Sequence, residues 1–162
     1  MCEYCGCQSL ASIDELTREH DEVVRLISHL RPAHEAGDAA RMAQVAREIA
    51  AVLGPHTRVE EHGLFPAMAE DFPDRIATLK AEHRHVDTVL EQAADGAVPE
   101  DPAWPDRLME VMELLRDHIL KEQDGVFPAA LSVLSTEQWA AVDAVRDEAG
   151  GALPRPAATA EA

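Results

Sequence analysis

Aromatic residues, basic residues and long apolar runs are all scarce in this chain of 162 residues. Only 4% of the residues are aromatic and β-branched runs are rare, which disfavours a β-sheet fold. Lys and Arg number 14 against 31 Asp and Glu, and a formal charge of −17 disfavours binding to nucleic acid or to anionic lipids. No apolar run approaches the roughly 20 residues of a membrane span. We therefore expect neither nucleic-acid nor membrane partners.

Cysteine is confined to the first seven positions, where Cys2, Cys5 and Cys7 form C-x-x-C and C-x-C spacings. An odd number of clustered cysteines is not typical of a secreted disulfide framework. The opening MCEYCGCQSL also lacks the basic and apolar regions of a signal peptide, so we expect a cytoplasmic protein. A thiolate metal site would need further ligands, and the sequence has no second cysteine pair. Residues 1–11 are therefore interpreted as a flexible, cysteine-containing tail.

Ala, Leu, Glu and Arg are abundant and 46% of the residues are hydrophobic, which favours a single helical domain with a buried core. Proline and glycine divide the chain into segments with helical periodicity. We predict four long helices at about 12–30, 38–70, 73–94 and 105–131, and a short fifth at 135–148 that opens with the capping-box pattern STEQ. The result is an all-α domain over residues 12–148, followed by a disordered tail over 149–162.

Each of the four long segments carries a histidine in line with its apolar stripe, and in the second and fourth a glutamate follows one turn later. A single histidine on such a stripe is most often an ordinary core residue. Several imidazoles and carboxylates in one core would be costly to desolvate unless something neutralised them, and a metal centre meets that need. The candidate metal ligands are His20, His56, Glu60, His83, His118 and Glu122.

These residues form an internal repeat. The motif E-H-x-x-V occurs at residues 19–23 and 82–86, and H-x-x-x-E occurs at residues 56–60 and 118–122. The histidines of the two motifs are 36 residues apart in the first half and 35 in the second. A duplicated helical hairpin predicts an approximate two-fold axis, with each hairpin supplying half of a two-metal site. Imidazole and carboxylate ligands suit Fe, Mn or Zn, and leave the choice among them open.

Glycine and proline flank the candidate ligands. Gly54 and Pro55 precede His56, which predicts either a kink or bulge that re-aims the histidine, or a break between two shorter helices. Gly63 and Gly125 are each followed by an apolar residue and F-P-A. We expect the helices to end or bend there, with each phenylalanine closing one end of a metal cavity.

The combined motifs resemble those of the hemerythrin-like, or HHE cation-binding, family over about Ile13 to Leu131. The resemblance implies an antiparallel up-down four-helix bundle, to which this chain adds the short C-terminal fifth helix. It also implies a non-haem pair of iron ions with an oxo or hydroxo bridge, bound by the six candidate ligands. The expected partner is a small ligand such as H2O2, NO or O2, in a role linked to oxidative stress.

Two positions depart from the oxygen-carrying hemerythrins. Those proteins have a second histidine four residues after the first on the third helix, where this chain has Asp87, and an aspartate where it has Gln123. Reversible oxygen transport is therefore disfavoured, and the leading hypothesis is a di-iron protein that consumes peroxide or nitric oxide. The alternative is a non-catalytic module that senses O2, NO or iron. Asp87 is a candidate for an extra ligand or for an acceptor that orients an imidazole, and Glu61 is an alternative to Glu60.

Overall fold

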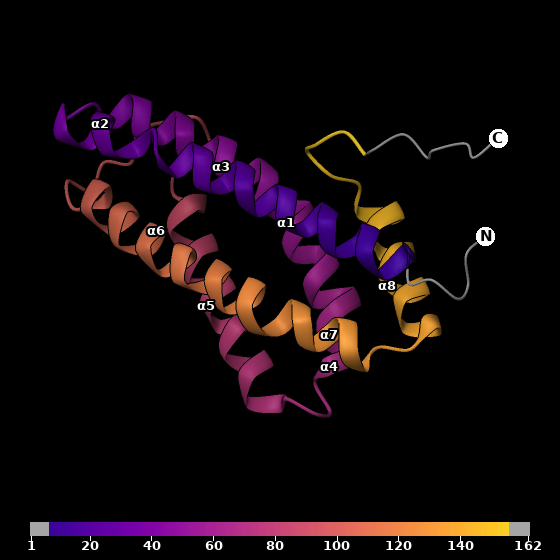
Figure 1. The fold of residues 1–162 in the computed structure, drawn as a ribbon. Coiled ribbons are helices and arrows are strands. Elements are labelled where there is room, and N and C mark those ends of the chain that lie inside the picture. The colour runs from indigo at the N-terminus through magenta and orange to yellow at the C-terminus, as the bar shows by residue number, and fades with distance from the viewer. Residues whose placement is uncertain (1–6, 156–162) are drawn as a thin grey trace.

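The computed structural model describes residues 7–155, which form helices joined by turns. Four long helices account for most of the chain: α1 (Cys7–Ile27), α3 (Ala39–Val59), α5 (Pro73–Glu91) and α6 (Trp104–Lys121). Helix α1 packs on α3 and α5 packs on α6, while contacts between α3 and α5 and between α1 and α6 join the two pairs (Figure 1). The prediction of an all-helical bundle is confirmed.

Short elements connect or extend the long helices. Helix α2 (Leu30–Glu35) lies between α1 and α3, and two π-helical turns, η1 (Glu60–Leu64) and η2 (Glu122–Val126), directly follow α3 and α6. Each π-helical turn continues into a short α-helix, α4 (Phe65–Met68) or α7 (Phe127–Val133), and α8 (Thr136–Ala149) completes the fold. The predicted capping box opens α8, because the Ser135 side chain accepts from the backbone of Gln138 and the Gln138 side chain accepts from the backbone of Ser135.

Two features of the long helices differ from the sequence predictions. Helix α1 begins at Cys7, whereas the sequence predicted a start at residue 12. The first turn buries little, with Leu10 58% exposed, so the apolar stripe gives no sign of it. Cys2 and Cys5 lie outside the described residues. Helix α3 runs without a break through Pro55, so the predicted alternative of two shorter helices is wrong, and the departure from α-helical geometry comes at η1.

The segment after α8 makes defined contacts, although the sequence predicted disorder from residue 149. Gly150 has a φ of +69°, which turns the chain back toward α1. The Arg155 guanidinium then pairs with Glu15 at 3.3 Å and with Asp147 at 2.6 Å. Ion pairs of this kind do not depend on hydrophobic content, so the composition did not predict the defined contacts of residues 149–155. The predicted limits of the domain, residues 12–148, stay a prediction.

The buried apolar side chains form two clusters along the bundle. The first contains residues of α2, of the C-terminal halves of α1 and α5, of most of α3 and of α6. The second contains residues of the N-terminal parts of α1 and α5, of the end of α3, and of α4, α7 and α8. Helices α1 and α5 run from the second cluster into the first, whereas α3, and α6 with its continuation through η2 and α7, run from the first into the second. The histidine predicted on each stripe lies at the boundary between the clusters, so the polar residues gather in the middle of the bundle.

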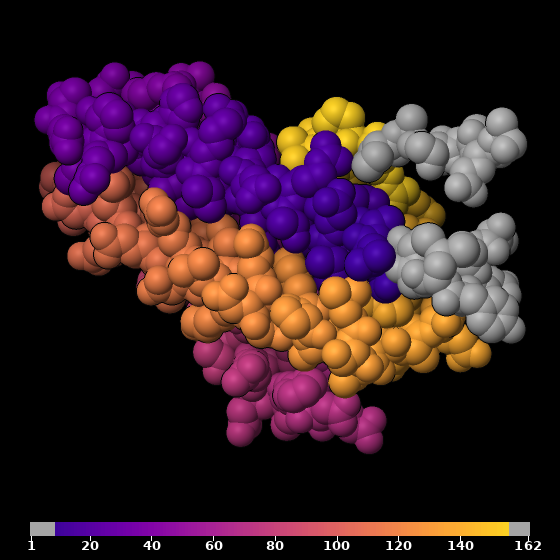
Figure 2. Space-filling model, viewed as in Figure 1, coloured from indigo at the N-terminus to yellow at the C-terminus, as the bar shows by residue number. Residues whose placement is uncertain are grey.

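The middle of the bundle is closed to solvent. Figure 2 shows one face on which α1 and the α6–α7 segment lie side by side. A surface pocket of about 260 Å³ lies between them, but the candidate ligand histidines and glutamates beneath are at most 6% exposed. Across residues 7–155, no helix combines the length and the apolar character needed to cross a membrane.

Candidate metal centre

The structure brings all six candidate ligands together and buries them. Each residue is at most 6% exposed, and Glu60 and Glu122 are completely buried. The potential ligand atoms form two groups, within each of which all atoms lie within 4.8 Å of one another. We call these groups the first subsite and the second subsite. The first contains His20 and His56, the second contains His83 and His118, and both contain Glu60 and Glu122.

The two glutamates occupy the first position of the two π-helical turns. A π-helical turn contains one more residue than an α-helical turn and is common at functional sites. The backbone N–H of Phe65 donates to Glu60, five residues earlier, and that of Phe127 donates in the same way to Glu122. In an α-helix, side chains five residues apart would lie about 140° apart around the axis. The wider turn brings the glutamate and the phenylalanine of each F-P-A motif to the same side of the helix.

Each glutamate contacts histidines of both hairpins. His56 Nε2 lies 3.0 Å from Glu60 Oε1, and His83 Nε2 lies 3.1 Å from Glu60 Oε2. Glu122 Oε1 lies 3.1 Å from the Nε2 atoms of both His20 and His118. The two carboxylates therefore lie between the subsites, as bridging ligands would.

The arrangement of the buried polar atoms suits a bound cation better than hydrogen bonds among the side chains. Among the described residues, both oxygens of Glu60 and Oε2 of Glu122 are buried without a hydrogen-bond partner. For Glu60 this holds although imidazole nitrogens lie about 3 Å away, because the directions of approach do not suit hydrogen bonds. His83 Nε2 and His118 Nε2 also face each other at 3.0 Å, which requires a shared proton or a cation. Nitrogen and oxygen donors converging in this way suit Fe, Mn or Zn.

Every candidate ligand histidine points its other ring nitrogen, Nδ1, at an acceptor. The four distances are 3.0 Å for His20 to Gln123, 3.2 Å for His56 to Glu19, 2.9 Å for His83 to Glu61 and 2.8 Å for His118 to Glu82. An N–H at Nδ1 donates to the acceptor and leaves the Nε2 lone pair directed at the centre, which is the usual arrangement of metal-bound histidine.

The role of the four acceptors was not predicted from the sequence, although the sequence contains a signal for it. Each acceptor is the direct chain neighbour of a candidate ligand, as in the repeated E-H pairs. The geometry also separates Glu60 from Glu61. Glu60 is completely buried between the subsites, whereas Glu61 is partly exposed and accepts from His83.

Without a cation, the centre favours protons on His56 and His83. Burial lowers the pKa of His56, but the carboxylates of Glu60 and Glu19 outweigh it and raise the pKa to about 10. At His83 burial is again outweighed, by Glu60 and Glu61, and the pKa is about 9. The pKa of Glu60 lies well below its ordinary value, because His56 and His83 outweigh the effect of its burial. The centre thus requires positive charge, which protons or metal ions can supply.

The two phenylalanines stack on histidines of the opposite hairpin. The Phe127 ring lies 5.4 Å from the His20 ring with 9° between the planes, and the Phe65 ring lies 5.7 Å from the His83 ring with 10° between the planes. The predicted position of each phenylalanine at the end of the centre agrees with this packing. The stacked rings limit the rotation of both imidazoles.

A cavity of about 10 Å³ adjoins the four histidines on the side of the apolar cluster that includes α2. It is large enough for a molecule about the size of water. Its other lining residues are Leu53, Thr57, Val86, Asp87, Leu115 and Ile119. Asp87 is partly buried, and burial raises its pKa, but it belongs to neither ligand group. Three further histidines, His29, His62 and His85, are exposed, and His34 pairs with Asp106 at 2.7 Å.

Comparisons with known proteins agree with this centre. The family model described as "Hemerythrin HHE cation binding domain" matches residues 11–130. A curated relative from Nostoc sp. (strain PCC 7120 / SAG 25.82 / UTEX 2576), named "DNA nickase", is 26% identical over 131 residues. The match covers 78% of this chain but 36% of the relative, so the chain spans about a third of that protein's length. No solved structure matches the chain significantly. On the family match and the buried His/Glu cluster, the chain belongs to the hemerythrin HHE cation-binding domain family.

Proposed function

We propose that the six buried residues bind two metal ions, with iron as the first candidate, and that the protein reacts with a small oxidant such as hydrogen peroxide. One observation carries the proposal. Two groups of nitrogen and oxygen donors share Glu60 and Glu122, and buried oxygens of both glutamates lack hydrogen-bond partners among the described residues. Nitric oxide and dioxygen are chemically related ligands of the same centre.

The proposal includes an antiparallel up-down arrangement of α1, α3, α5 and α6. The cluster order reverses from α1 to α3, from α3 to α5, and from α5 to α6 with its continuation through η2 and α7, and this supports the arrangement. Neighbouring helices that run in opposite directions meet two fixed clusters in opposite order. Such an arrangement allows one residue from each helix to reach the same level of the bundle.

The chain's own residues would orient the donors and select the ligand. Hydrogen bonds from Nδ1 hold each imidazole with Nε2 toward the centre. The small cavity, with Leu53, Val86 and Leu115 in its wall, admits a ligand of few atoms and excludes bulk water. Bound iron would supply the redox and Lewis-acid chemistry for such a ligand.

The test is metal analysis of the isolated protein, with its ultraviolet and visible spectrum recorded before and after addition of peroxide. We expect about two irons per chain and a spectrum that peroxide changes. The iron-loaded protein should consume peroxide faster than the same amount of free iron. Equal rates would overturn the proposed reaction, and protein without bound metal would overturn the metal centre itself. Binding of NO or O2 without turnover would support the sensing alternative.

The similarity to a protein named DNA nickase makes DNA cleavage the second candidate. The match spans 36% of that relative, so the remainder of the relative could carry the nicking activity. A formal charge of −17 also disfavours contact with phosphate backbones. Supercoiled plasmid incubated with the metal-loaded protein distinguishes the two. We expect the plasmid to stay supercoiled, and relaxation that is lost in the His118→Ala variant would favour DNA cleavage.

A further inference from the structure

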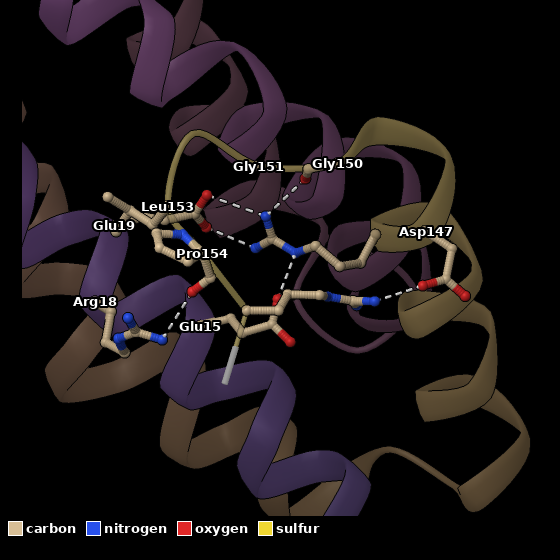
Figure 3. Close-up of a pocket in the computed structure, with 10 residues that line it drawn as sticks. Glu15, Arg18, Glu19, Asp147, Gly150, Gly151, Leu153 and Pro154 are labelled. Atoms are coloured by element: carbon tan, nitrogen blue, oxygen red, sulfur yellow. Dashed lines mark hydrogen bonds and ion pairs between the residues drawn. The ribbon is translucent and has the colours of Figure 1, made fainter. Parts of the chain in front are cut away.

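A buried arginine outside the residues that match the family model is connected to the first subsite through a glutamate. Arg146 lies on α8, beyond the match to residues 11–130, and is only 5% exposed. Its guanidinium donates to Glu19 at 2.6 Å through Nη2 and at 3.0 Å through Nη1, and its Nε lies 3.2 Å from Glu15. Glu15, Glu19 and Arg146 line a pocket of about 370 Å³ between α1 and the C-terminal segment. Figure 3 shows the two glutamates beside this pocket.

The contacts run from Arg146 through Glu19 to the first subsite. Glu19 Oε1 accepts from Arg146 Nη2 and also from His56 Nδ1, at 3.2 Å. Glu19 is 3% exposed, so water cannot readily replace either contact. A two-point bond from a planar guanidinium fixes the plane of a carboxylate, which in turn fixes the imidazole that donates to it.

The backbone after α8 packs closely against the Arg146 guanidinium. Gly150, in the left-handed region, presents its carbonyl to Arg146 Nη1 at 3.2 Å. A Cβ atom at Gly151 would lie 3.3 Å from the same nitrogen and 3.6 Å from Glu19 Oε2. The close cover leaves the guanidinium little freedom to leave Glu19.

The second subsite has a weaker counterpart of this arrangement. Glu82, which accepts from His118, also accepts from Lys121. The Lys121 side chain is 49% exposed, whereas that of Arg146 is 6% exposed. An exposed ammonium contributes little to stability, and water can replace it. Glu82 is therefore held less firmly than Glu19, although the internal repeat relates the two halves.

We propose that Arg146 is a positioning residue that makes metal binding at the first subsite depend on α8, whereas binding at the second subsite does not. The inference rests on the proposed function, because it assigns Arg146 a role in the metal centre described above. It also assigns α8 a purpose beyond covering the apolar core.

Anaerobic titration with Co(II), followed by its absorption spectrum and by competition with a chelator, tests the inference. Wild-type protein should bind about two Co(II) per chain. Arg146→Met should weaken one of the two sites by about 10–100-fold, the usual effect of losing a partner behind a metal ligand. Lys121→Met is the matched control and should leave both affinities within about threefold. Arg146→Lys should give an intermediate affinity, because one ammonium keeps the charge but not the two-point bond.

Two variants that each lack one ligand histidine show which subsite responds to the loss of Arg146. In the His118→Ala chain the first subsite keeps both histidines, and Arg146→Met should remove its tight binding. In the His20→Ala chain the second subsite keeps both histidines, and the same substitution should change its affinity by less than about threefold. A general loss of stability would weaken both backgrounds alike and would overturn the inference.

Removal of Arg146 leaves Glu19 buried without its partner, so the single variant could fail to fold. The double variant Glu19→Gln/Arg146→Met avoids the buried charge and copies the neutral acceptor that Gln123 provides for His20. We expect it to fold and still to show the weakened first subsite. Wild-type affinity at both sites in any folded Arg146→Met chain would overturn the inference alone, whereas a wild-type protein that binds no Co(II) would overturn the proposed function with it.

Discussion

The Nε2 atoms of His83 and His118 lie 3.0 Å apart, although the two residues stand on different helices and are separated by 35 positions in the chain. Their rings are 4.6 Å apart with an angle of 52°, and the rings of His20 and His56 repeat this geometry at 4.6 Å and 51°. The internal repeat of the sequence is therefore present in the side chains as well as in the helices.

Stability of the metal-free protein should fall as the pH rises above neutrality. The pKa values of His56 and His83 are about 10 and about 9 in the folded chain, above the ordinary histidine value of about 6.5. A raised pKa stabilises the folded state fully below the unfolded value, and this contribution is lost as the pH passes through the folded values. Urea unfolding at pH 6, 8 and 10 measures the change. A metal-free protein with constant stability over this range would contradict the assignment, and metal-loaded protein is the control.

Removal of Glu122 should cost both metals, whereas removal of one histidine should mainly affect its own subsite. Glu122 contacts His20 and His118 and belongs to both ligand groups. We expect Glu122→Ala to lower the metal content from about two per chain to near zero, and His20→Ala to leave about one. Elemental analysis and circular dichroism measure metal and fold together. The exposed His62 supplies the control His62→Ala, which should retain both metals, and Glu122→Ala with one full site would argue against bridging.

Gly63→Ala should destabilise the protein by about 1–3 kcal/mol, the usual cost of overpacking. A Cβ at this position would lie 3.2 Å from the Cα of Val142, so α8 would have to move away from η1. Gly54→Ala is the matched control. Nothing lies within 4 Å of a Cβ there, and alanine in helix α3 should stabilise by about 0.5–1 kcal/mol. Thermal unfolding of the two variants should give shifts of opposite sign, and equal shifts would contradict the close packing of α8.

Asp87→Ala should leave the metal content unchanged. Asp87 lines the small cavity but lies outside both ligand groups, and the Nδ1 atom of His83 donates to Glu61. Glu61→Ala should by contrast weaken the second subsite by about 10–100-fold. Metal analysis of both variants decides between the two acids. Loss of metal in Asp87→Ala would restore Asp87 as a ligand.

The sequence predicted the helical fold and the residues at its centre because both follow from local periodicity. A histidine that completes an apolar stripe must point inward wherever the stripe is buried, and His20, His56, His83 and His118 all do so. The π-helical turns could not be predicted in the same way, because they depend on how Glu60 and Glu122 are packed. Arg146 was missed for a related reason. It meets Glu19 across 127 positions, and no spacing rule links such distant residues.

Phe127 stacks on His20 and Phe65 stacks on His83, so each hairpin covers a histidine of the other. Glu60 and Glu122 likewise reach across the boundary between the hairpins. Neither half can enclose a complete centre by itself, but two identical copies of one hairpin could exchange the same contacts around a two-fold axis. One polypeptide therefore contains the reciprocal contacts of a symmetric dimer. Because its two halves are separate stretches of sequence, they need not be identical, and Glu61 in one half corresponds to Gln123 in the other.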